Sequence, residues 1–288
     1  MVVVDKPSGL TSHQVVGRIR RLAGTRKVGH AGTLDPLATG VLVVGVNRAT
    51  RLLGHLTLTE KDYEATIRLG VSTITDDAEG DIVALAGAAG ITEHRVLDQL
   101  PQFRGSILQR PTAVSAIKVN GVRSYARVRA GEDVELAARP VRVARFDVLA
   151  FRSDQQDQTP VLDLDVAVTC SSGTYIRALA RDLGAAVGSG GHLTALRRTR
   201  VGPFGITQAQ TLDEAAVHLA LIDLADVARQ CFATVAVDAE QTEWVRHGRR
   251  LPEVQLPAAR AALLSPAGEF LALYRQSGPD AIAESVFV

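Results

Sequence analysis

The order of its predicted elements places this 288-residue chain in the α+β class. Two segments, 61–70 and 161–170, alternate apolar and polar residues, which predicts half-buried strands. Segment 12–22 instead repeats its apolar residues at helical spacing, with arginines on the other side. Strands and helices follow one another irregularly and the chain ends in a β-rich stretch. We therefore expect a sheet with flanking helices and a small second domain.

Each element has a local signal. A short buried strand opens the chain at 2–5, and Thr11 or Ser12 can cap the helix that follows by accepting a backbone N–H. In the strand at 61–70, Tyr63 lies on the apolar face. The other predicted elements are a strand at 40–46, a short helix around 49–56, an acidic turn at 73–81, a Thr92-capped helix at 92–100, strand-like pieces within 106–150, a helix at 175–187 ended by glycines, and a weakly amphipathic segment at 211–230.

The amino-acid composition is that of an ordinary globular protein. The chain is 46% hydrophobic and 22% charged, as in ordinary globular proteins, and its longest apolar runs are only strand-sized. Charged residues by position 6 argue against a signal peptide, so we expect a cytoplasmic protein without a membrane partner. Cys170 and Cys231 lack the spacing of a zinc site, and nothing in the sequence motivates a disulfide between them.

Basic residues gather in four acid-free clusters although the net charge is only +1. Any one cluster by itself is best explained as a solvated surface. Four of them favour a surface that binds phosphates. The clusters lie at 18–27, 123–129, 196–200 and 246–250.

The loop GHAGTLDPLATG (29–40) holds a single carboxylate, Asp35, between glycines and a buried strand. One interpretation is a simple Asx-type turn before Pro36. The other is a carboxylate presented for chemistry, which needs a cationic partner. Arg177 is a candidate partner, because a basic residue in the first turn of a helix is unfavourable for the helix dipole. The alternative is that Arg177 is an ordinary surface arginine.

Tyr63 and Tyr175 either stack on a base or are buried with satisfied hydroxyls.

These residues carry a resemblance. GHAGTLDPLATG resembles the aspartate motif of the bacterial tRNA pseudouridine-55 synthases, the TruB family. Six further blocks agree in order over roughly residues 1–210, which makes the signal highly specific. They are DKPSGLTS (5–12), KDYEATIRLG (61–70), TDDAEG (75–80), PTAVSAIKVNGVRSYARVRAG (111–131), CSSGTYIRALARDLG (170–184) and GGHLTALRRTRVGPF (190–204).

The resemblance implies a role for each matched residue. Asp35 is the expected catalytic carboxylate, Arg177 its ion-pair partner, and Tyr63 the residue that stacks on the flipped uracil and assists proton transfer. The remaining expected contacts are with the substrate RNA. They are His30, Asp77, Tyr175, Leu196, Lys6, Lys118, Arg123 and Arg127.

The resemblance also implies the architecture and the reaction. We expect a mixed, mainly antiparallel sheet in a pseudouridine synthase domain (1–230), with a mobile RNA-clamping segment at 106–145, and a PUA-like RNA-binding domain at 231–288. The enzyme is expected to isomerise uridine 55 in the T stem-loop of transfer RNA, as a monomer, without metal, cofactor or guide RNA. Sequence leaves open whether Asp35 acts as nucleophile or base.

Two departures and three alternatives accompany this interpretation. Thr112 and Val114 stand in a segment where the family commonly has proline and an aromatic residue, and the match of 231–288 is loose. One alternative is a guide-dependent, dyskerin-type synthase. A second is an RNA-binding or RNA-folding module whose aspartate is only structural. A P-loop interpretation of the segment around 23–32 fails, because it contains no Gly-Lys-Ser/Thr.

Overall fold

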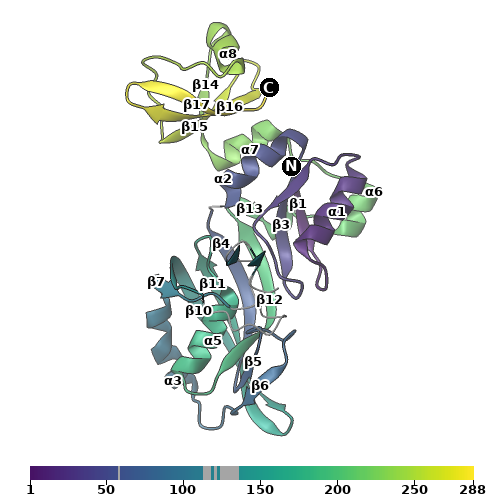
Figure 1. Ribbon diagram of the computed structural model, residues 1–288, viewed down its shortest axis with the longest axis vertical. Coiled ribbons are helices and arrows are strands. Elements are labelled where there is room, and N and C mark those ends of the chain that lie inside the picture. The colour runs from purple at the N-terminus through teal and green to yellow at the C-terminus, as the bar shows by residue number, and fades with distance from the viewer. Residues whose placement is uncertain (58, 113–117, 120–121, 124–135) are drawn as a thin grey trace.

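A nine-stranded sheet forms the centre of the computed structural model (Figure 1). The structure describes residues 1–57, 59–112, 118–119, 122–123 and 136–288. Seven strands lie side by side in the order β1 (Val2–Lys6), β3 (Thr39–Val46), β12 (Gly191–Val201), β4 (Lys61–Leu69), β11 (Thr159–Cys170), β10 (Arg139–Gln156) and β7 (Gly105–Gln109). At the side of this row, β2 (Val28–Ala31) pairs with β3, and β13 (Phe204–Gly205) pairs with β12.

The pairing of the strands is mixed. β3 and β12 run parallel, whereas the other strand pairs described in this sheet are antiparallel. The expected α+β fold with a mixed, mainly antiparallel sheet is therefore confirmed. The strand at 61–70 also alternates as predicted, with Tyr63 and every second residue after it buried.

Helices cover both faces of the sheet at the β1–β3 end. α1 (Ser12–Leu22) packs on one face through Val15, Val16 and Ile19, and Thr11 caps it by accepting the N–H of Gln14. α6 (Leu212–Val217) lies beside α1. On the opposite face are α2 (Leu53–Thr57), which follows a 3-10 turn (Asn47–Leu52), and α7 (Leu224–Cys231).

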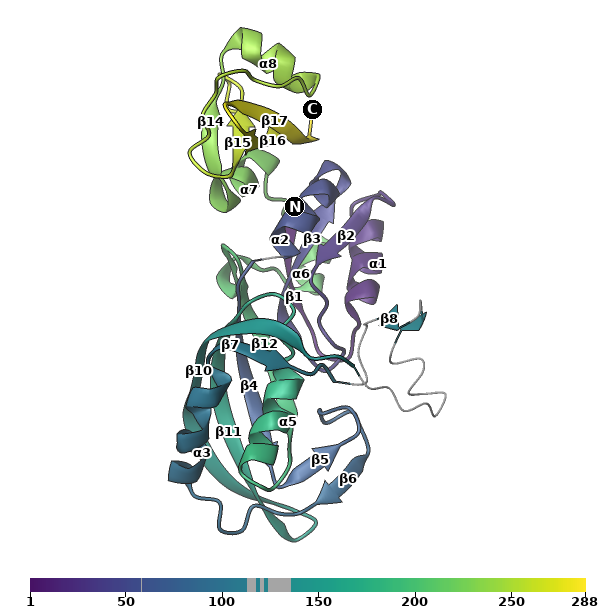
Figure 2. The same ribbon diagram turned by 60° about the vertical axis from the view of Figure 1, so that its left-hand side comes forward.

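At the other end of the sheet, α5 (Ile176–Ala186) and α3 (Glu93–Gln99) cover one face (Figure 2). The predicted cap of α3, Thr92, accepts the N–H of Arg95. The opposite face carries polar side chains, among them Glu64, Thr66 and Asp165. Across the described residues, no helix has the length and apolar character that a membrane crossing needs.

Short elements connect these layers. A ribbon of β5 (Val71–Thr73) and β6 (Ile82–Leu85) carries the acidic turn between its strands. A second ribbon pairs β8 (Lys118–Val119) with β9 (Val122–Arg123). The remaining 3-10 turns are Leu100–Phe103 and Ile206–Gln208.

The C-terminal part of the chain forms a separate four-stranded sheet, at the top of Figure 1. Its strands are β14 (Ala233–Ala236), β15 (Arg260–Leu264), β16 (Phe270–Ser277) and β17 (Asp280–Val286), with α8 (Ala239–Arg246) beside them. The unit has a core of its own, and its Phe270, Leu273 and Phe287 also join a cluster with Leu56 and Val227 of the larger unit. The expected β-rich C-terminal unit is present.

The segment 106–145, expected to be a mobile clamp, is described only at its ends and in the β8–β9 ribbon. Both ends belong to the central sheet, because β7 and the beginning of β10 pair from Gly105↔Val143 to Gln109↔Arg139. The mobility expected for 106–145 stays a prediction. The centre of this segment lies outside the described residues.

Candidate active site

Asp35 lies on the loop between β2 and β3, and the predicted ion pair with Arg177 is present. Nε of Arg177, in the first turn of α5, is 3.0 Å from Oδ2 of Asp35. The side chain of Asp35 is 40% exposed, whereas that of Arg177 is 8% exposed. The arginine is therefore a fixed, buried group, and the carboxylate that it contacts is open to solvent and to a substrate.

Hydrogen bonds fix the backbone on both sides of Asp35. Ser12 Oγ accepts the N–H of Leu34 at 2.9 Å and donates to its carbonyl at 3.0 Å. The carbonyl of Pro36 accepts the N–H of Gly9 at 2.9 Å. The turn itself is closed by the backbone, with Ala38 N–H donating to the Asp35 carbonyl at 3.1 Å. The Asp35 side chain is thus not needed to close the turn and is available for another role.

Lys6 holds the same loop through its side chain, and its expected contact with RNA stays a prediction. The residue is 0% exposed, and its ammonium donates to the carbonyls of Pro7, Leu10 and Pro36 at 2.9, 2.6 and 3.2 Å. Burial lowers the pKa of Lys6 to about 8, and the Asp35 carboxylate opposes this shift. A side chain enclosed in this way holds the loop.

Asp77 is a second partner of Arg177, and its expected contact with the RNA loop stays a prediction. Its Oδ2 lies 3.3 Å from NH1 of Arg177, and the carboxylate also accepts the Thr75 hydroxyl at 2.5 Å. The carbonyl of Thr75 in turn accepts Arg177 NH1 at 2.8 Å. Asp77 is buried, so it orients the guanidinium that faces Asp35.

Arg181, one helical turn after Arg177, forms a second ion pair between α5 and the acidic turn. The sequence patterns do not single out this residue. Its NH1 lies 3.1 Å from Oδ2 of Asp76, which also accepts the hydroxyl of Thr112 at 2.8 Å. Burial raises the pKa of Asp76, while Thr112 and the two arginines of α5 oppose the shift. The available signal was the spacing: arginines at i and i+4 share one helix face, opposite two adjacent aspartates.

Tyr63 and Leu196 lie on the same face of neighbouring strands. In the β4–β12 pairing Tyr63 is opposite Arg198, and Ala65 is opposite Leu196. Tyr63 is buried, which raises the pKa of its hydroxyl, while Leu196 is partly buried. The structure therefore brings these two predicted site residues onto one surface.

Tyr175 and His30 are both partly exposed. Tyr175 is the residue before α5, where Gln109 fixes its backbone by accepting its N–H at 2.8 Å and donating to its carbonyl at 3.0 Å. His30 lies in β2, and burial lowers the pKa of its imidazole. Its Nδ1 is buried without a hydrogen-bond partner among the described residues.

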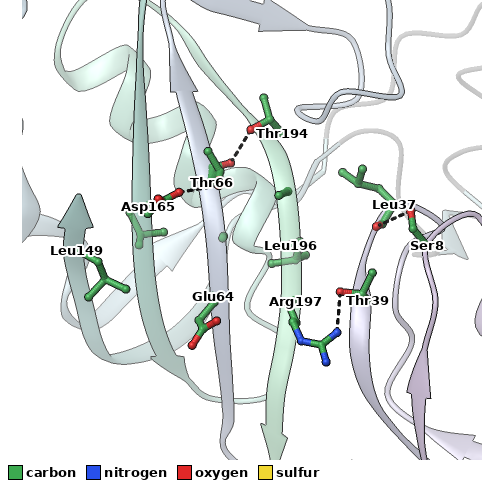
Figure 3. Close-up of a pocket in the computed structure, with 13 residues that line it drawn as sticks. Ser8, Leu37, Thr39, Glu64, Thr66, Leu149, Asp165, Thr194, Leu196 and Arg197 are labelled. Atoms are coloured by element: carbon green, nitrogen blue, oxygen red, sulfur yellow. Dashed lines mark hydrogen bonds between the residues drawn. The ribbon is translucent and has the colours of Figure 1, made fainter. Parts of the chain in front are cut away.

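A pocket of about 660 Å³ lies on the opposite, polar face of the sheet (Figure 3). Glu64, Thr66 and Asp165 line it on one side, and Ser8 and Thr39 on the other. Arg197 NH1 bridges the sides by donating to the Thr39 hydroxyl at 3.3 Å, and Thr66 donates to Asp165 at 2.8 Å. Leu196 also lines this pocket, whereas Asp35, Arg177 and Tyr63 do not.

The four basic clusters have different environments. In cluster 196–200, Arg198 is buried and Arg197 and Arg200 pair with Asp5 and Asp62, so the prediction that this cluster binds phosphates is wrong. In cluster 246–250, Arg246 pairs with Glu269 and Arg250 with Asp280.

Cluster 18–27 matches the prediction of an open basic surface. Its five cations are exposed, and none forms an ion pair with a described residue. We call this surface the α1 basic face; it consists of Arg18, Arg20, Arg21, Arg26 and Lys27. In cluster 123–129, Arg127 falls outside the described residues, and Lys118 and Arg123 are described only through the backbone of the β8–β9 ribbon.

The chemistry available at Asp35 is that of a single open carboxylate. In the part of the chain that the structure describes, no three His, Cys, Asp or Glu side chains gather as metal ligands would. Asp35 can act as a nucleophile or as a general base, with Arg177 holding its orientation. The neighbouring tyrosine and leucine offer a flat and an apolar surface, which suits a planar base removed from its stack.

Three family models match consecutive parts of the chain. Residues 20–176 match the model of the TruB family pseudouridylate synthase N-terminal domain, residues 177–232 the tRNA pseudouridylate synthase B C-terminal domain, and residues 232–288 the C-terminal domain of tRNA pseudouridine synthase II.

Relatives named tRNA pseudouridine synthase B match almost the whole chain. The relative from Cutibacterium acnes is 58% identical and covers 96% of this chain and 92% of its own length. The relative from Streptomyces griseus is 53% identical and covers 100% and 96%. Among solved structures, a chain of an H/ACA RNP bound to a substrate RNA containing 2′-deoxyuridine has a TM-score of 0.73 at 25% identity, and the match covers 100% of this chain and 84% of that one.

Proposed function

The chain belongs to the TruB family of pseudouridylate synthases and is a transfer RNA pseudouridine synthase; on that premise, we propose that it converts uridine 55 of the T-loop to pseudouridine. The observation that carries the proposal is the contact between Asp35 and Arg177, a half-exposed carboxylate held by a buried guanidinium. The isomerisation breaks the C–N glycosidic bond, rotates the uracil and joins its C5 to the ribose. It consumes no co-reactant, so one reactive carboxylate suffices.

Asp35 is the group that acts on the nucleoside. As a nucleophile it forms a transient bond to the ribose or the base, and as a base it removes a ribose proton. In both routes the carboxylate must be close to the sugar and must not rotate away. The bonds from Ser12 and Arg177 provide this restraint.

The flipped uracil lies against the surface formed by Tyr63, Leu196 and Tyr175. The charges of Arg198 and Asp35 both affect the pKa of the Tyr63 hydroxyl, so this tyrosine belongs to the surroundings of the Asp35 loop. A base that has left its stack recovers part of the missing stacking on such aromatic and apolar groups. His30, at the start of the loop, contacts the rearranged RNA.

The α1 basic face binds phosphates of the same RNA. Ser12, at the beginning of α1, contacts the residue next to Asp35, and Arg18 and Arg21 follow about 9 and 14 Å further along the helix axis. RNA whose base enters the site therefore extends past these cations. The segment carrying Lys118, Arg123 and Arg127 clamps the T stem-loop, and the C-terminal unit, as a PUA-like domain, adds a further RNA contact.

We also propose that the enzyme acts in the cytoplasm as a monomer and without a guide RNA. Full-length relatives with more than half of their residues identical are named for transfer RNA. The similarity to a chain of an H/ACA RNP is lower, at 25% identity. Sedimentation of the pure chain, with and without transfer RNA, gives the number of copies in the active complex.

Tritium release from transfer RNA transcripts labelled at uridine C5 tests the reaction, with the pure chain and no other RNA present. Release should occur from a transcript with uridine 55 and stop when position 55 is cytidine. Asp35→Asn should slow single-turnover release by at least about 10⁴-fold, because it removes the reacting group. Asp213→Asn, at an exposed aspartate in the first turn of α6, is the matched control and should release tritium at the wild-type rate.

Three results contradict parts of the proposal. Wild-type release by Asp35→Asn means that Asp35 is not the reacting carboxylate and has only a structural role. Release from the cytidine-55 transcript places the target elsewhere. Release only after addition of a cellular RNA fraction establishes a guide-dependent enzyme.

A further inference from the structure

Arg198 is a buried cation in the middle of β12 whose side chain holds both ends of the Asp35 loop. The residue is 1% exposed. Its Nε donates to the carbonyl of Val41 at 2.8 Å, across 157 positions of sequence. Its two terminal nitrogens donate to the carbonyls of Gly32 and Thr33 at 3.0 and 3.3 Å. One planar guanidinium thus links the residues just before Asp35 to the strand just after the loop.

The backbone of Arg198 contacts the loop as well. β3 and β12 pair in parallel with Arg198 beside Gly40, which has a φ of +97°. A Cβ at Gly40 would lie 2.2 Å from the Arg198 carbonyl oxygen and 2.9 Å from its nitrogen. Only glycine permits this conformation and this approach. The end of the loop is therefore fixed against Arg198 through both main chain and side chain.

The same guanidinium reaches Tyr63. The two residues are opposite each other in the β4–β12 pairing, so their side chains lie on the same face of the sheet, and the charge of Arg198 acts on the Tyr63 hydroxyl. Burial raises the pKa of Tyr63, and the charge of Arg198 opposes that rise. Arg198 is accordingly the group that connects Tyr63 with the loop of Asp35.

This arrangement is electrostatically costly, which argues that it serves more than stability. Among the described residues no carboxylate pairs with Arg198, and the acceptors of its side chain are the carbonyl dipoles of Gly32, Thr33 and Val41. A second buried cation, Lys61, lies close enough that Arg198 contributes to lowering its pKa to about 8, after burial as the main cause. Lys61 donates to the carbonyls of Thr57 and Thr59, outside the loop, and so provides a matched comparison.

We propose that Arg198 is a positioning residue that holds the Asp35 loop and the Tyr63 hydroxyl as one rigid unit, so that both groups keep their relative place while RNA enters. The proposal rests on the proposed function, because it assigns Arg198 an effect exerted through Asp35 and Tyr63. Arg198 itself does not contact the substrate. Its removal should therefore reduce the chemical step and leave RNA affinity nearly unchanged.

The test compares Arg198→Met with Lys61→Met by single-turnover tritium release, filter binding of transfer RNA and thermal unfolding. Both variants remove a buried cation, so both should unfold at a lower temperature. Arg198→Met should slow release about 100-fold, the cost of a displacement of about 1 Å, with a dissociation constant within about threefold of wild type. Lys61→Met should keep its rate within about threefold, because its acceptors lie outside the loop. A folded Arg198→Met variant with a wild-type rate, or equal rate losses in both variants, overturns the proposal.

A second readout follows the tyrosine directly. With ¹³C at the tyrosine Cζ, the Tyr63 resonance should titrate at higher pH in Arg198→Met than in Lys61→Met, because only the first lacks the cation at the hydroxyl. An identical titration in the two variants contradicts the connection between Arg198 and Tyr63.

If Arg198→Met does not fold, the proposal is tested with the single variants Arg198→Lys and Tyr63→Phe and with the double variant that combines them. Because Arg198 acts partly through Tyr63, the rate loss of the double variant should be smaller than the product of the two single losses, whereas losses that multiply overturn the connection between Arg198 and Tyr63. Failure of the proposed function is seen separately, as wild-type release by Asp35→Asn.

Discussion

The Asp35 loop, which contacts the beginning of α1 through Ser12, and the α1 basic face use cations in opposite ways. Around the loop, Lys6 and Arg198 are buried and donate to backbone carbonyls at both of its ends. On the α1 basic face the cations are exposed and form no ion pair with a described residue. The buried cations determine geometry, and the exposed ones provide charge for a polyanion.

The physical reason for the difference is solvation. A buried cation loses its hydration and keeps its charge only if fixed dipoles replace the water, so its position is tightly determined. An exposed cation keeps its hydration and contributes little to the stability of the fold. It contributes to RNA affinity through release of counterions from the phosphates. Three predictions test this contrast, from the largest expected effect to the smallest.

Replacing Arg177 by alanine should affect turnover most. The change removes the donor that orients Asp35 and leaves the buried carboxylate of Asp77 without this partner. We expect the single-turnover rate to fall about 10²- to 10³-fold, as when one preorganised donor is removed from an active site. The dissociation constant for transfer RNA should change by less than about threefold, since Arg177 is buried. Equal reductions of rate and affinity would indicate a phosphate contact instead.

Replacing Lys6 by methionine should reduce stability more than it reduces turnover. At pH 7 the free energy of unfolding should fall by about 2 kcal/mol, because three carbonyls lose a charged donor. Urea unfolding measures the change. Ser8→Ala, which removes an exposed hydroxyl donating to the Leu37 carbonyl of the same loop, is the control and should cost less.

The difference in stability between the wild type and Lys6→Met should depend on pH, and the pKa of Lys6 determines the sign of this dependence. Burial lowers the pKa of Lys6 in the folded protein to about 8, below its ordinary 10.5. Between these pH values the unfolded chain binds more protons, so raising the pH stabilises the wild type relative to Lys6→Met, by at most about 1.4 kcal/mol per pH unit. A stability difference that stays constant from pH 8 to 10 contradicts this account.

Removing charge from the α1 basic face should have the smallest effect, and only on RNA binding. In Arg18→Gln/Arg21→Gln the slope of log affinity against log salt should become shallower by about 0.7 to 0.9 for each phosphate that the protein no longer neutralises. Stability should change by less than about 0.5 kcal/mol, because both side chains are exposed. The control is Arg152→Gln, at an arginine that pairs with Asp165 on the polar sheet face. An unchanged slope in the double variant removes the α1 basic face from the RNA-binding surface.

The contrast between the two regions also explains which site residues can be predicted from the sequence. Asp35, Arg177 and Tyr63 were placed from the motifs, and the structure shows the expected contact between the first two. The motifs also name Lys6 and Asp77 as RNA contacts; the structure shows that both are buried against the protein, a feature that the motifs do not indicate. A sequence motif identifies a functionally important position. It does not show whether the charged side chain at that position faces the substrate or the protein interior.

Arg198 shows the same limit more strongly. In the sequence it is one of three basic residues in the cluster 196–200, which resembles a solvated surface. In the fold, strand alternation separates it from Arg197 and directs it to the face of Tyr63. Its acceptors come from the far N-terminal loop, so local sequence contained no indication of its burial.

The sequence by itself determined the caps, the alternating strands, the helix spacing and the family, because these depend on contacts between residues a few positions apart and on motifs that can be read in order. Only the tertiary structure decided which cations are buried, which carboxylates they meet, and that one guanidinium links Tyr63 to both ends of the Asp35 loop. Burial and partner choice depend on packing between segments far apart in the chain, and these distances exist only once the sheet has assembled.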